Sequence, residues 1–165
     1  MFDALTGIPN RLFYEKRVVE DVGRWKRFET PLSIAIWDVD KFKNVNDSYG
    51  HKAGDKVLKA IAQILHKRIR ETDFLARYGG EEFVMLLPGT IEEETLRLAN
   101  ELRMAVEKCS FHYADAAVPI TISCGISGFR PGDELAAVFE RADQALYRAK
   151  AAGRNRCVVA ACKSQ

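Results

Sequence analysis

The sequence predicts an α+β fold with a β-α-β-β-α-β core, the ferredoxin-like arrangement, in which helices flank a central antiparallel sheet. Two observations lead to this prediction. Segments with helical spacing of apolar residues alternate with short β-rich runs, and near the middle of the chain two such runs are joined by a Gly-Gly turn. The predicted order is helix, strand, helix, hairpin, helix, strand, helix and strand, which contains that core.

The first half of the chain supplies a helix, a strand and a second helix. Apolar residues at roughly helical spacing predict the first helix, from about Leu12 to Phe28: Leu12, Val18, Val19, Val22 and Trp25. The β-rich run from Leu32 to Trp37 predicts a central strand, and Asp38-Val39-Asp40 places carboxylates at its C-terminal end. Residues 41–53 are polar and turn-rich. The second helix is expected to begin near Gly54 and to carry one apolar face, made of Val57, Leu58, Ile61, Ile64, Leu65 and Ile69.

A hairpin is expected next. The runs Asp73–Tyr78 and Phe83–Leu87 flank Gly79-Gly80, which indicates a tight turn because both glycines reach positive φ without strain. Bare glycine backbone also lets a large planar or phosphorylated ligand approach closely. Glu81 and Glu82 follow directly, and two adjacent carboxylates held by a turn attract a cation. An exposed turn with charges for solubility is the alternative for so short a motif.

The remainder of the chain alternates helix and strand. The segment Thr90-Ile91-Glu92-Glu93 has a capping-box pattern, which predicts a helix with a buried stripe of Ile91, Leu98, Leu102, Ala105 and Cys109. Alternation and β-branched residues from Val118 to Phe129 predict a strand. A helix over Asp133–Ala152 and a last strand over Cys157–Ala160 complete the prediction.

Length and composition indicate one globular domain: the chain has 165 residues, of which 47% are hydrophobic and 29% charged. The formal net charge of +2 is too small to indicate nucleic-acid or membrane binding. No signal peptide and no membrane-spanning apolar run is present in the sequence. The cysteines form no Cys-x-x-Cys pair, so we expect reduced thiols of a cytosolic protein rather than zinc ligands: Cys109, Cys124, Cys157 and Cys162. Because the chain begins almost inside a motif, residues 1–165 are expected to be one domain of a longer protein.

Several carboxylates are expected to meet at one end of the predicted sheet. In a β-α-β-β-α-β sheet the first and third strands are antiparallel neighbours, so Asp38 should lie beside Glu81 and Glu82. Packed without a cation, these groups would repel one another by several kcal/mol. Hard oxygen ligands in this number suit Mg²⁺ or Mn²⁺, which complete their coordination with phosphate oxygens and water. A coincidence of exposed acids is the alternative.

At these segments the sequence resembles the GGDEF-domain diguanylate cyclases, in the GGEEF variant. The resemblance covers essentially the whole chain and rests on four segments: Asp3-x-Leu5-Thr6-Gly7-x-x-Asn10-Arg11, Asp38-Val39-Asp40-x-Phe42-Lys43-x-x-Asn46-Asp47-x-x-Gly50-His51-x-x-Gly54-Asp55, Arg77-Tyr78-Gly79-Gly80-Glu81-Glu82-Phe83 and Gly153-Arg154-Asn155. The resemblance implies a palm-like fold shared with nucleotidyl cyclases and polymerases. It also implies condensation of two GTP into cyclic di-GMP and two pyrophosphates.

Carried over to this sequence, the resemblance implies that Asp38, the Val39 carbonyl and Glu82 hold the metal ions. Glu81 would serve the metal site or help to deprotonate the attacking 3′-hydroxyl. The resemblance also implies two guanine-reading residues, Asn46 and Asp55. An amide and a carboxylate complement the carbonyl and N–H groups of guanine, and adenine would leave the carboxylate unpaired. Taken alone, Asp55 could be an acid favoured at a helix N-terminus, and Asn46 an ordinary turn residue.

The resemblance implies a phosphate site made of two cations, three backbone amides and the glycine turn: Lys150, Arg154, the N–H groups of Lys41, Phe42 and Lys43, and Gly79 with Gly80. Cations in a last helical turn also suit the helix dipole, which is the alternative for Lys150 and Arg154. The family usually has an aromatic residue where Lys41 stands. The pair Arg70 and Asp73 matches the family's Arg-x-x-Asp inhibitory site for the product, and a salt bridge at a helix end is the alternative there.

One chain carries one set of nucleotide-binding residues, but the product contains two nucleotides. We therefore expect a homodimer as the working unit, with GTP as substrate and cyclic di-GMP as product and inhibitor. No nucleic-acid or membrane contact is expected. A non-catalytic receptor that binds cyclic di-GMP or GTP is the alternative from another functional class.

Overall fold

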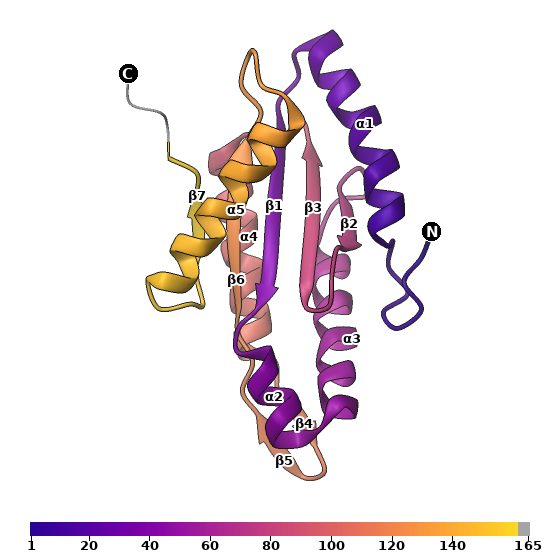
Figure 1. Ribbon diagram of the computed structural model, residues 1–165, viewed down its shortest axis with the longest axis vertical. Coiled ribbons are helices and arrows are strands. Elements are labelled where there is room, and N and C mark those ends of the chain that lie inside the picture. Colours follow the sequence, from indigo (N-terminus) through magenta and orange to yellow (C-terminus); the bar gives the residue numbers. More distant parts are fainter. Residues whose placement is uncertain (162–165) are drawn as a thin grey trace.

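The computed structural model describes residues 1–161. Five strands form one sheet in the order β2-β3-β1-β6-β7 (Figure 1), with these bounds: β1 Leu32–Val39, β2 Phe74–Arg77, β3 Glu82–Pro88, β6 Ile122–Gly128 and β7 Cys157–Val159. Within this sheet β2, β3, β1 and β6 pair antiparallel with their neighbours, whereas β7 runs parallel to β6. This order confirms the predicted β-α-β-β-α-β core, with β7 added at one edge.

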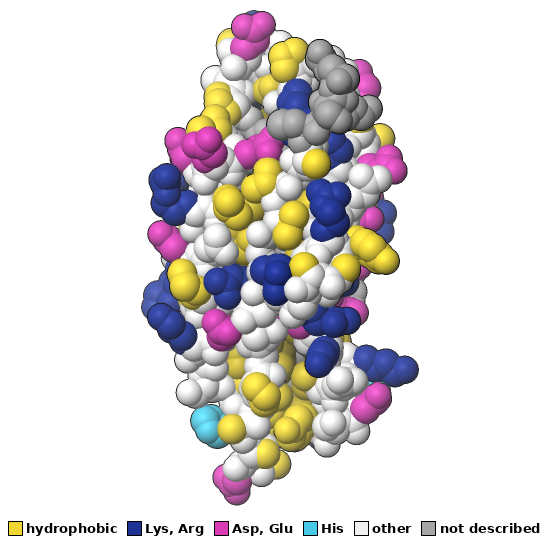
Figure 2. Space-filling model, turned by 90° about the vertical axis from the view of Figure 1, so that its left-hand side faces the viewer, with side chains coloured by type: hydrophobic (Ala, Val, Ile, Leu, Met, Phe, Trp, Pro, Cys, Tyr) yellow, Lys and Arg dark blue, Asp and Glu magenta, His cyan; other side chains and the backbone are white. Residues whose placement is uncertain are grey.

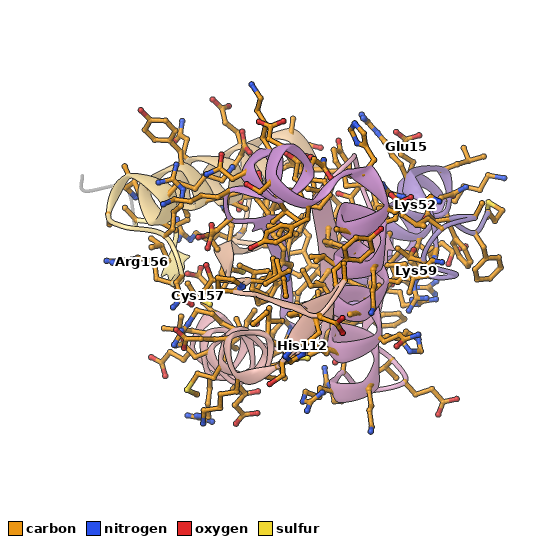
Figure 3. All side chains as sticks on the ribbon, turned by 90° about the horizontal axis from the view of Figure 1, so that it is seen from below. Glu15, Lys52, Lys59, His112, Arg156 and Cys157 are labelled. Carbon is orange, nitrogen blue, oxygen red and sulfur yellow. The ribbon has the colours of Figure 1, made fainter. Side chains whose placement is uncertain are left out.

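Five helices surround the sheet: α1 Arg11–Phe28, α2 Phe42–Tyr49, α3 His51–Arg68, α4 Glu92–Lys108 and α5 Leu135–Ala151. In Figure 1, α1 and α5 lie on the near side of the sheet and α3 and α4 on the far side. From below (Figure 3), Lys52 and Lys59 mark α3, and Cys157 marks β7 on the other side of the molecule.

Two hydrophobic cores result from the alternation of side chains along the central strand β1. Trp37 packs with the buried residues of α3 and α4, such as Leu65 and Leu102. Ile36, the preceding residue, belongs to the other cluster, which includes Val138 of α5. All eight residues of β1 are buried, as expected for a strand covered on both faces. The core therefore holds β1 rigidly and fixes where its last residues emerge.

The segment predicted as polar turns contains a helix. Residues 42–49 form α2, and α3 begins at His51 rather than near Gly54. In α2 only the spacing of Phe42, Val45 and Tyr49 marks an apolar face, which is a weak signal over eight residues.

A small hairpin was also missed, and it shortens the strand predicted over Val118–Phe129. Strands β4 (Phe111–Tyr113) and β5 (Ala116–Val118) pair with each other, and β6 begins only at Ile122. Their turn is Ala114-Asp115, with φ of 50° and 65°. Without an Asn-Gly or Gly-Gly pair, the sequence lacks the usual signal for such a turn.

Two local expectations about turns and caps were wrong. Gly79 and Gly80 do join β2 to β3, but neither glycine has positive φ. The connection spans residues 78–81, and the Glu82 carbonyl accepts hydrogen bonds from the Tyr78 and Gly79 amides. This longer loop does not need the left-handed conformations of a two-residue turn.

The capping box is also absent at α4, because the N-cap residue is Ile91, whose side chain cannot accept a hydrogen bond.

The predicted apolar faces of α1 and α4 need correction. Leu12 and Val19 are 50% and 68% exposed, and α1 instead buries Tyr14, Val18 and Asp21. Helix α4 buries a stripe that shares one residue with the predicted one: Thr95, Ala99, Leu102 and Val106. In both helices small or polar residues occupy part of the buried face. A prediction based on apolar residues alone therefore put the buried face a fraction of a turn from its observed position.

Other features follow the predictions closely. Helix α3 buries Val57, Leu58, Ile61 and Leu65, and α5 and β7 stand where they were expected. Three cysteines are free thiols, namely Cys109, Cys124 and Cys157, while Cys162 lies outside the described residues. Over residues 1–161, no helix is both long and apolar enough to cross a lipid bilayer.

Candidate active site

The centre of the candidate site is a carboxylate pair that two strands hold face to face. Asp38, near the end of β1, is the register partner of Glu82, the first residue of β3. This confirms the predicted neighbourhood of Asp38 and the Glu81-Glu82 pair. Asp38 is 7% exposed, and its Oδ2 accepts a hydrogen bond from Nζ of Lys150, near the end of α5. Elements from three parts of the chain therefore converge on Asp38.

The electrostatics of this cluster favour an additional cation. Burial raises the pKa of the Asp38 carboxyl; Lys150 opposes this shift, and Glu81 adds to it. Burial also raises the pKa of Glu82, and the carboxylates of Asp38, Glu81 and Asp143 raise it further. The pKa of both groups stays raised although Lys150 is present, so one ammonium does not offset the burial of the two carboxyls together with the repulsion among the carboxylates.

A preformed metal cage is not part of this arrangement. Within residues 1–161, no three His, Cys, Asp or Glu side chains converge closely enough to hold a metal ion. The assignment of Asp38, Val39, Glu81 and Glu82 to a metal therefore stays a prediction. The donor chemistry still fits a hard divalent cation. The buried Asp38 carboxylate already binds the Lys150 ammonium, and it lies opposite a second carboxylate, that of Glu82. Magnesium ions commonly use one or two protein carboxylates and take their other ligands from phosphate and water.

Asp40 does not share the environment of Asp38. Its Oδ1 accepts a hydrogen bond from Oγ of Ser123 at 2.7 Å, and its Oδ2 accepts from Oγ1 of Thr121 at 2.8 Å and from the Asn155 amide at 2.9 Å. Both oxygens are therefore engaged by protein donors. The charge of Asp40 still helps to raise the pKa of Asp38, but its oxygens bind β6 and the turn at Asn155.

The N-terminus of α2 presents backbone amides beside two cations. Lys41 has a left-handed φ of 54°, and its carbonyl accepts the amides of Asn44 and Val45. The amides of residues 41–43 precede this first helical bond, so the helix itself supplies no acceptor for them. Lys41 and Arg154 line the same cleft of about 420 Å³. Figure 2 shows the side of the molecule that carries β7, where Lys and Arg side chains gather across the middle.

The predicted guanine-reading residues are brought together by the packing of α2 on α3. The side-chain oxygen of Asn46 lies directly against Gly54, because a Cβ built on Gly54 would stand 2.0 Å from it. This Oδ1 is buried and has no hydrogen-bond partner within residues 1–161. Asp55 follows Gly54 in α3 and is exposed. Neither Asn46 nor Asp55 lines the cleft that Lys41 and Arg154 share.

The glycine loop is held by Arg77, a residue to which sequence reasoning gave no role. Nε of Arg77 donates to the Gly79 and Gly80 carbonyls at 3.2 and 3.1 Å, and Nη2 donates to Gly80 at 2.8 Å. Nη1 reaches both carboxylate oxygens of Asp3 at 3.2 Å. Thr6 donates to the same carboxylate through its amide and its hydroxyl. Arg77 thus ties the N-terminal segment to the loop before Glu81. In the sequence, the only indication of this role is an arginine placed just before two glycines, whose carbonyls its guanidinium can reach.

A family model described as "Diguanylate cyclase, GGDEF domain" matches residues 1–156. The chain belongs to the GGDEF-domain family. The diguanylate cyclase DgcP of Pseudomonas aeruginosa is 52% identical over 158 residues, which are 96% of this chain but 24% of that protein. Diguanylate cyclase DosC of Escherichia coli is 39% identical over 93% of this chain and 34% of its own length. This GGDEF domain therefore spans about a quarter to a third of the length of these curated relatives.

Solved GGDEF domains have the same architecture. The GGDEF domain of DgcB from Caulobacter crescentus, determined in complex with c-di-GMP, superposes with a TM-score of 0.94 at 33% identity, over 96% of this chain and 95% of that one. The active GGEEF domain of a diguanylate cyclase from Vibrio cholerae superposes with a TM-score of 0.89 at 35% identity, over 94% and 99% of the two chains. These similarities confirm the predicted fold class and family.

The predicted inhibitory pair of this GGDEF domain lies at the other end of the sheet from Asp38. Asp73 is buried, and its oxygens accept the Arg70 amide at 2.9 Å and the guanidinium at 2.8 and 3.2 Å. The guanidinium also donates to the Pro88 carbonyl at 2.9 Å and to Oγ1 of Thr90 at 2.6 Å. These contacts leave the Arg70 side chain 56% exposed. In this arrangement Arg70 faces solvent and Asp73 serves as its anchor.

Proposed function

We propose that this GGDEF domain condenses two GTP molecules into cyclic di-GMP and two pyrophosphates, with a divalent metal ion as cofactor. The observation that carries the proposal is the register pair of Asp38 and Glu82, beside Lys150, at the edge of a loop that reads Gly-Gly-Glu-Glu. The names of the curated relatives, which are diguanylate cyclases, support the same activity.

Mg²⁺ or Mn²⁺ would be held by Asp38, the Val39 carbonyl and Glu82, with Glu81 alongside. When bound, the ion would neutralise charge on the α-phosphate and lower the pKa of the attacking 3′-hydroxyl. Glu81, which is half-buried and next in the chain to Glu82, would assist removal of the hydroxyl proton. Lys150 would exchange its contact with Asp38 for the triphosphate, because the carboxylate then has another cation nearby.

GTP would be selected by Asn46 and Asp55. The Asn46 amide and a carboxylate complement the carbonyl and the N–H groups that guanine presents on one edge. The exposed Asp55 carboxylate would accept a second bond from this edge. Adenine presents an unprotonated nitrogen at the corresponding position, so ATP would leave an acceptor unpaired.

The triphosphate would be bound by backbone amides and by two cations. The free amides at residues 41–43 and the bare backbone of Gly79-Gly80 suit phosphate oxygens, which accept several hydrogen bonds at once. Lys150 and Arg154 would supply the positive charge. The side chain of Lys41 is exposed and is not required for a contact through its amide.

Catalysis would require two copies of the domain. Each chain would present its GTP so that the 3′-hydroxyl of one nucleotide reaches the α-phosphate of the other, which makes a homodimer the working unit. Cyclic di-GMP would inhibit through Arg70 and Asp73, away from the reacting atoms. A complex of the similar DgcB domain with c-di-GMP supports binding of the product by such a domain.

The test is to incubate the protein with GTP and Mg²⁺ and to identify the products by mass. Cyclic di-GMP and pyrophosphate are expected from the wild type, and a Glu82→Gln variant that thermal unfolding shows to be folded should make neither. Binding of cyclic di-GMP or GTP without turnover by the wild type would instead support the non-catalytic receptor.

A further inference from the structure

The turn between α5 and β7 has three consecutive residues in left-handed conformation. The φ angles of Gly153, Arg154 and Asn155 are 124°, 64° and 48°. Gly153 and Arg154 form a helix C-cap in which the Arg154 amide bonds the Ala149 carbonyl at 3.0 Å and the Gly153 amide bonds the Lys150 carbonyl at 3.3 Å. That cap explains the glycine. It does not explain why two residues with side chains follow in a conformation that disfavours them.

The inner side of this turn is held by Asp40. The carboxylate is 8% exposed and accepts three hydrogen bonds, two from the hydroxyls of Thr121 and Ser123 and one from the Asn155 amide. The two hydroxyls belong to the start of β6 and the residue before it, so they orient Asp40 from the rigid sheet. A charge-assisted hydrogen bond that a backbone amide donates to a buried carboxylate is strong, and here it fixes the backbone of Asn155.

The outer side of the turn is held by α4 through the Asn155 side chain. Oδ1 of Asn155 accepts from Nη1 of Arg103 at 3.0 Å, and Nδ2 donates to Oε2 of Glu107 at 2.5 Å. Arg103 and Glu107 also form an ion pair one turn apart on the helix, at 3.7 Å. An amide is suited to this place because it can accept from the cation and donate to the anion, which a carboxylate cannot do.

We propose that Asp40, Arg103 and Glu107 clamp Asn155 and thereby position Arg154 for the triphosphate. Asp40 is then a positioning residue and not a metal ligand, despite its place two residues after Asp38. The inference rests on the proposed function, since it assigns Arg154 to a phosphate of GTP. Without the clamp, the turn relaxes from its left-handed conformation, and the backbone at Arg154 no longer sets the direction in which its side chain leaves the turn.

The clamp is tested by steady-state kinetics with GTP and by GTP binding to Asn155→Gly. Glycine accepts a φ of 48° without strain, so this variant keeps the turn sterically possible while it loses both contacts to α4. We expect the KM and the Kd for GTP to rise about 10-fold, with kcat within about 2-fold of the wild type. Glu101→Gln on the same helix is the matched control, because Glu101 is exposed and forms no ion pair within the described residues. It should behave as the wild type.

Double variants separate positioning from a general structural effect. In an Arg154→Ala background, Asn155→Gly should add less than about 2-fold to KM, because the clamp acts only through Arg154. A full 10-fold addition would show a role elsewhere in the fold. Asp40→Asn should also raise the KM for GTP, yet leave the Mg²⁺ concentration for half-maximal rate at saturating GTP unchanged. A large rise in that Mg²⁺ concentration would make Asp40 a metal ligand and overturn the proposal.

The controls also distinguish failure of the clamp from failure of the proposed function. If Arg154→Ala weakens GTP binding while Asn155→Gly and Asp40→Asn bind GTP as the wild type does, the clamp alone is refuted. If the wild type neither binds nor turns over GTP, the proposed function is refuted, and the role of Arg154 falls with it.

Discussion

Gly54→Ala is the smallest substitution that reaches the proposed guanine pocket, since it adds one methyl group to α3. An ideal Cβ at this position would stand 2.0 Å from Oδ1 and 3.1 Å from Cγ of Asn46, and 3.0 Å from Cζ of Phe42. To restore even a tight contact of about 3 Å, the Asn46 oxygen must move by about 1 Å. A misplacement of this size at a substrate-positioning group can cost about 10²-fold in rate. We therefore expect kcat/KM for GTP to fall about 10²-fold.

The effect on folding should be small, because two contributions oppose each other. Replacing glycine by alanine inside a helix gains about 1 kcal/mol, whereas overpacking a filled site costs about 1–3 kcal/mol. The net change in the free energy of unfolding should thus stay within about 2 kcal/mol, and the variant should be folded at 25 °C. Thermal unfolding and kcat/KM for GTP, measured on the same sample, separate the two effects.

Gly23→Ala is the matched control. Gly23 lies within α1, and a Cβ there meets no atom within 4 Å. This variant should gain up to about 1 kcal/mol of stability and keep its kcat/KM. In an Asn46→Ala background, Gly54→Ala should cause almost no further loss, because the clashing group is gone. Wild-type kcat/KM in Gly54→Ala alone would refute the reasoning, as it would mean that the position of Asn46 does not matter.

Three further perturbations test other parts of the site. In metal-free buffer Glu82→Gln should raise Tm at pH 7–8, because the raised pKa makes the ionised carboxyl unfavourable in the fold. The gain should disappear below the carboxyl's ordinary pKa of 4.5, where folded and unfolded states are both protonated, and a gain that persists there has another cause. Arg77→Lys, which keeps the charge but loses the fork between Asp3 and the Gly80 carbonyl, should lower kcat at least about 10-fold; unchanged turnover would contradict its positioning role. Arg70→Ala should weaken inhibition by cyclic di-GMP about 10- to 150-fold without lowering the initial rate, and it should lower Tm because Asp73 is left buried without its partner. Inhibition at the wild-type concentration would exclude this site.

The sequence allowed the centre of the site to be predicted because the relevant information is local and topological. Asp38 ends an apolar run, Glu82 begins another, and the ferredoxin-like order makes those strands neighbours. The observed register of Asp38 with Glu82 follows from these facts without any knowledge of side-chain packing. Helix α3 was predicted for the same reason, since its apolar period persists over several turns.

What could not be predicted depends on partners that are distant in sequence. Asp40 resembles Asp38 in sequence, yet it is engaged by residues about 80 and 115 positions away. Its role could be recognised only after β6 and the turn at Asn155 had been placed beside β1. The α2 helix and the hairpin around Ala114-Asp115 were missed for a different reason, because such short elements give little periodic signal and the hairpin turn contains no glycine.

The buried Asp38 shows why both kinds of information are needed to understand the site. From its place in the sequence it is a carboxylate in a repulsive cluster, which predicts a cation. In the structure that cation is Lys150, from a helix that ends more than 110 residues later. The same lysine is expected to bind the triphosphate, and one ammonium cannot fully compensate the charges of Asp38 and of GTP at the same time. Binding of GTP should therefore leave Asp38 short of positive charge unless a metal ion accompanies the nucleotide. On this argument the need for a divalent metal follows from the shared lysine as much as from the carboxylates.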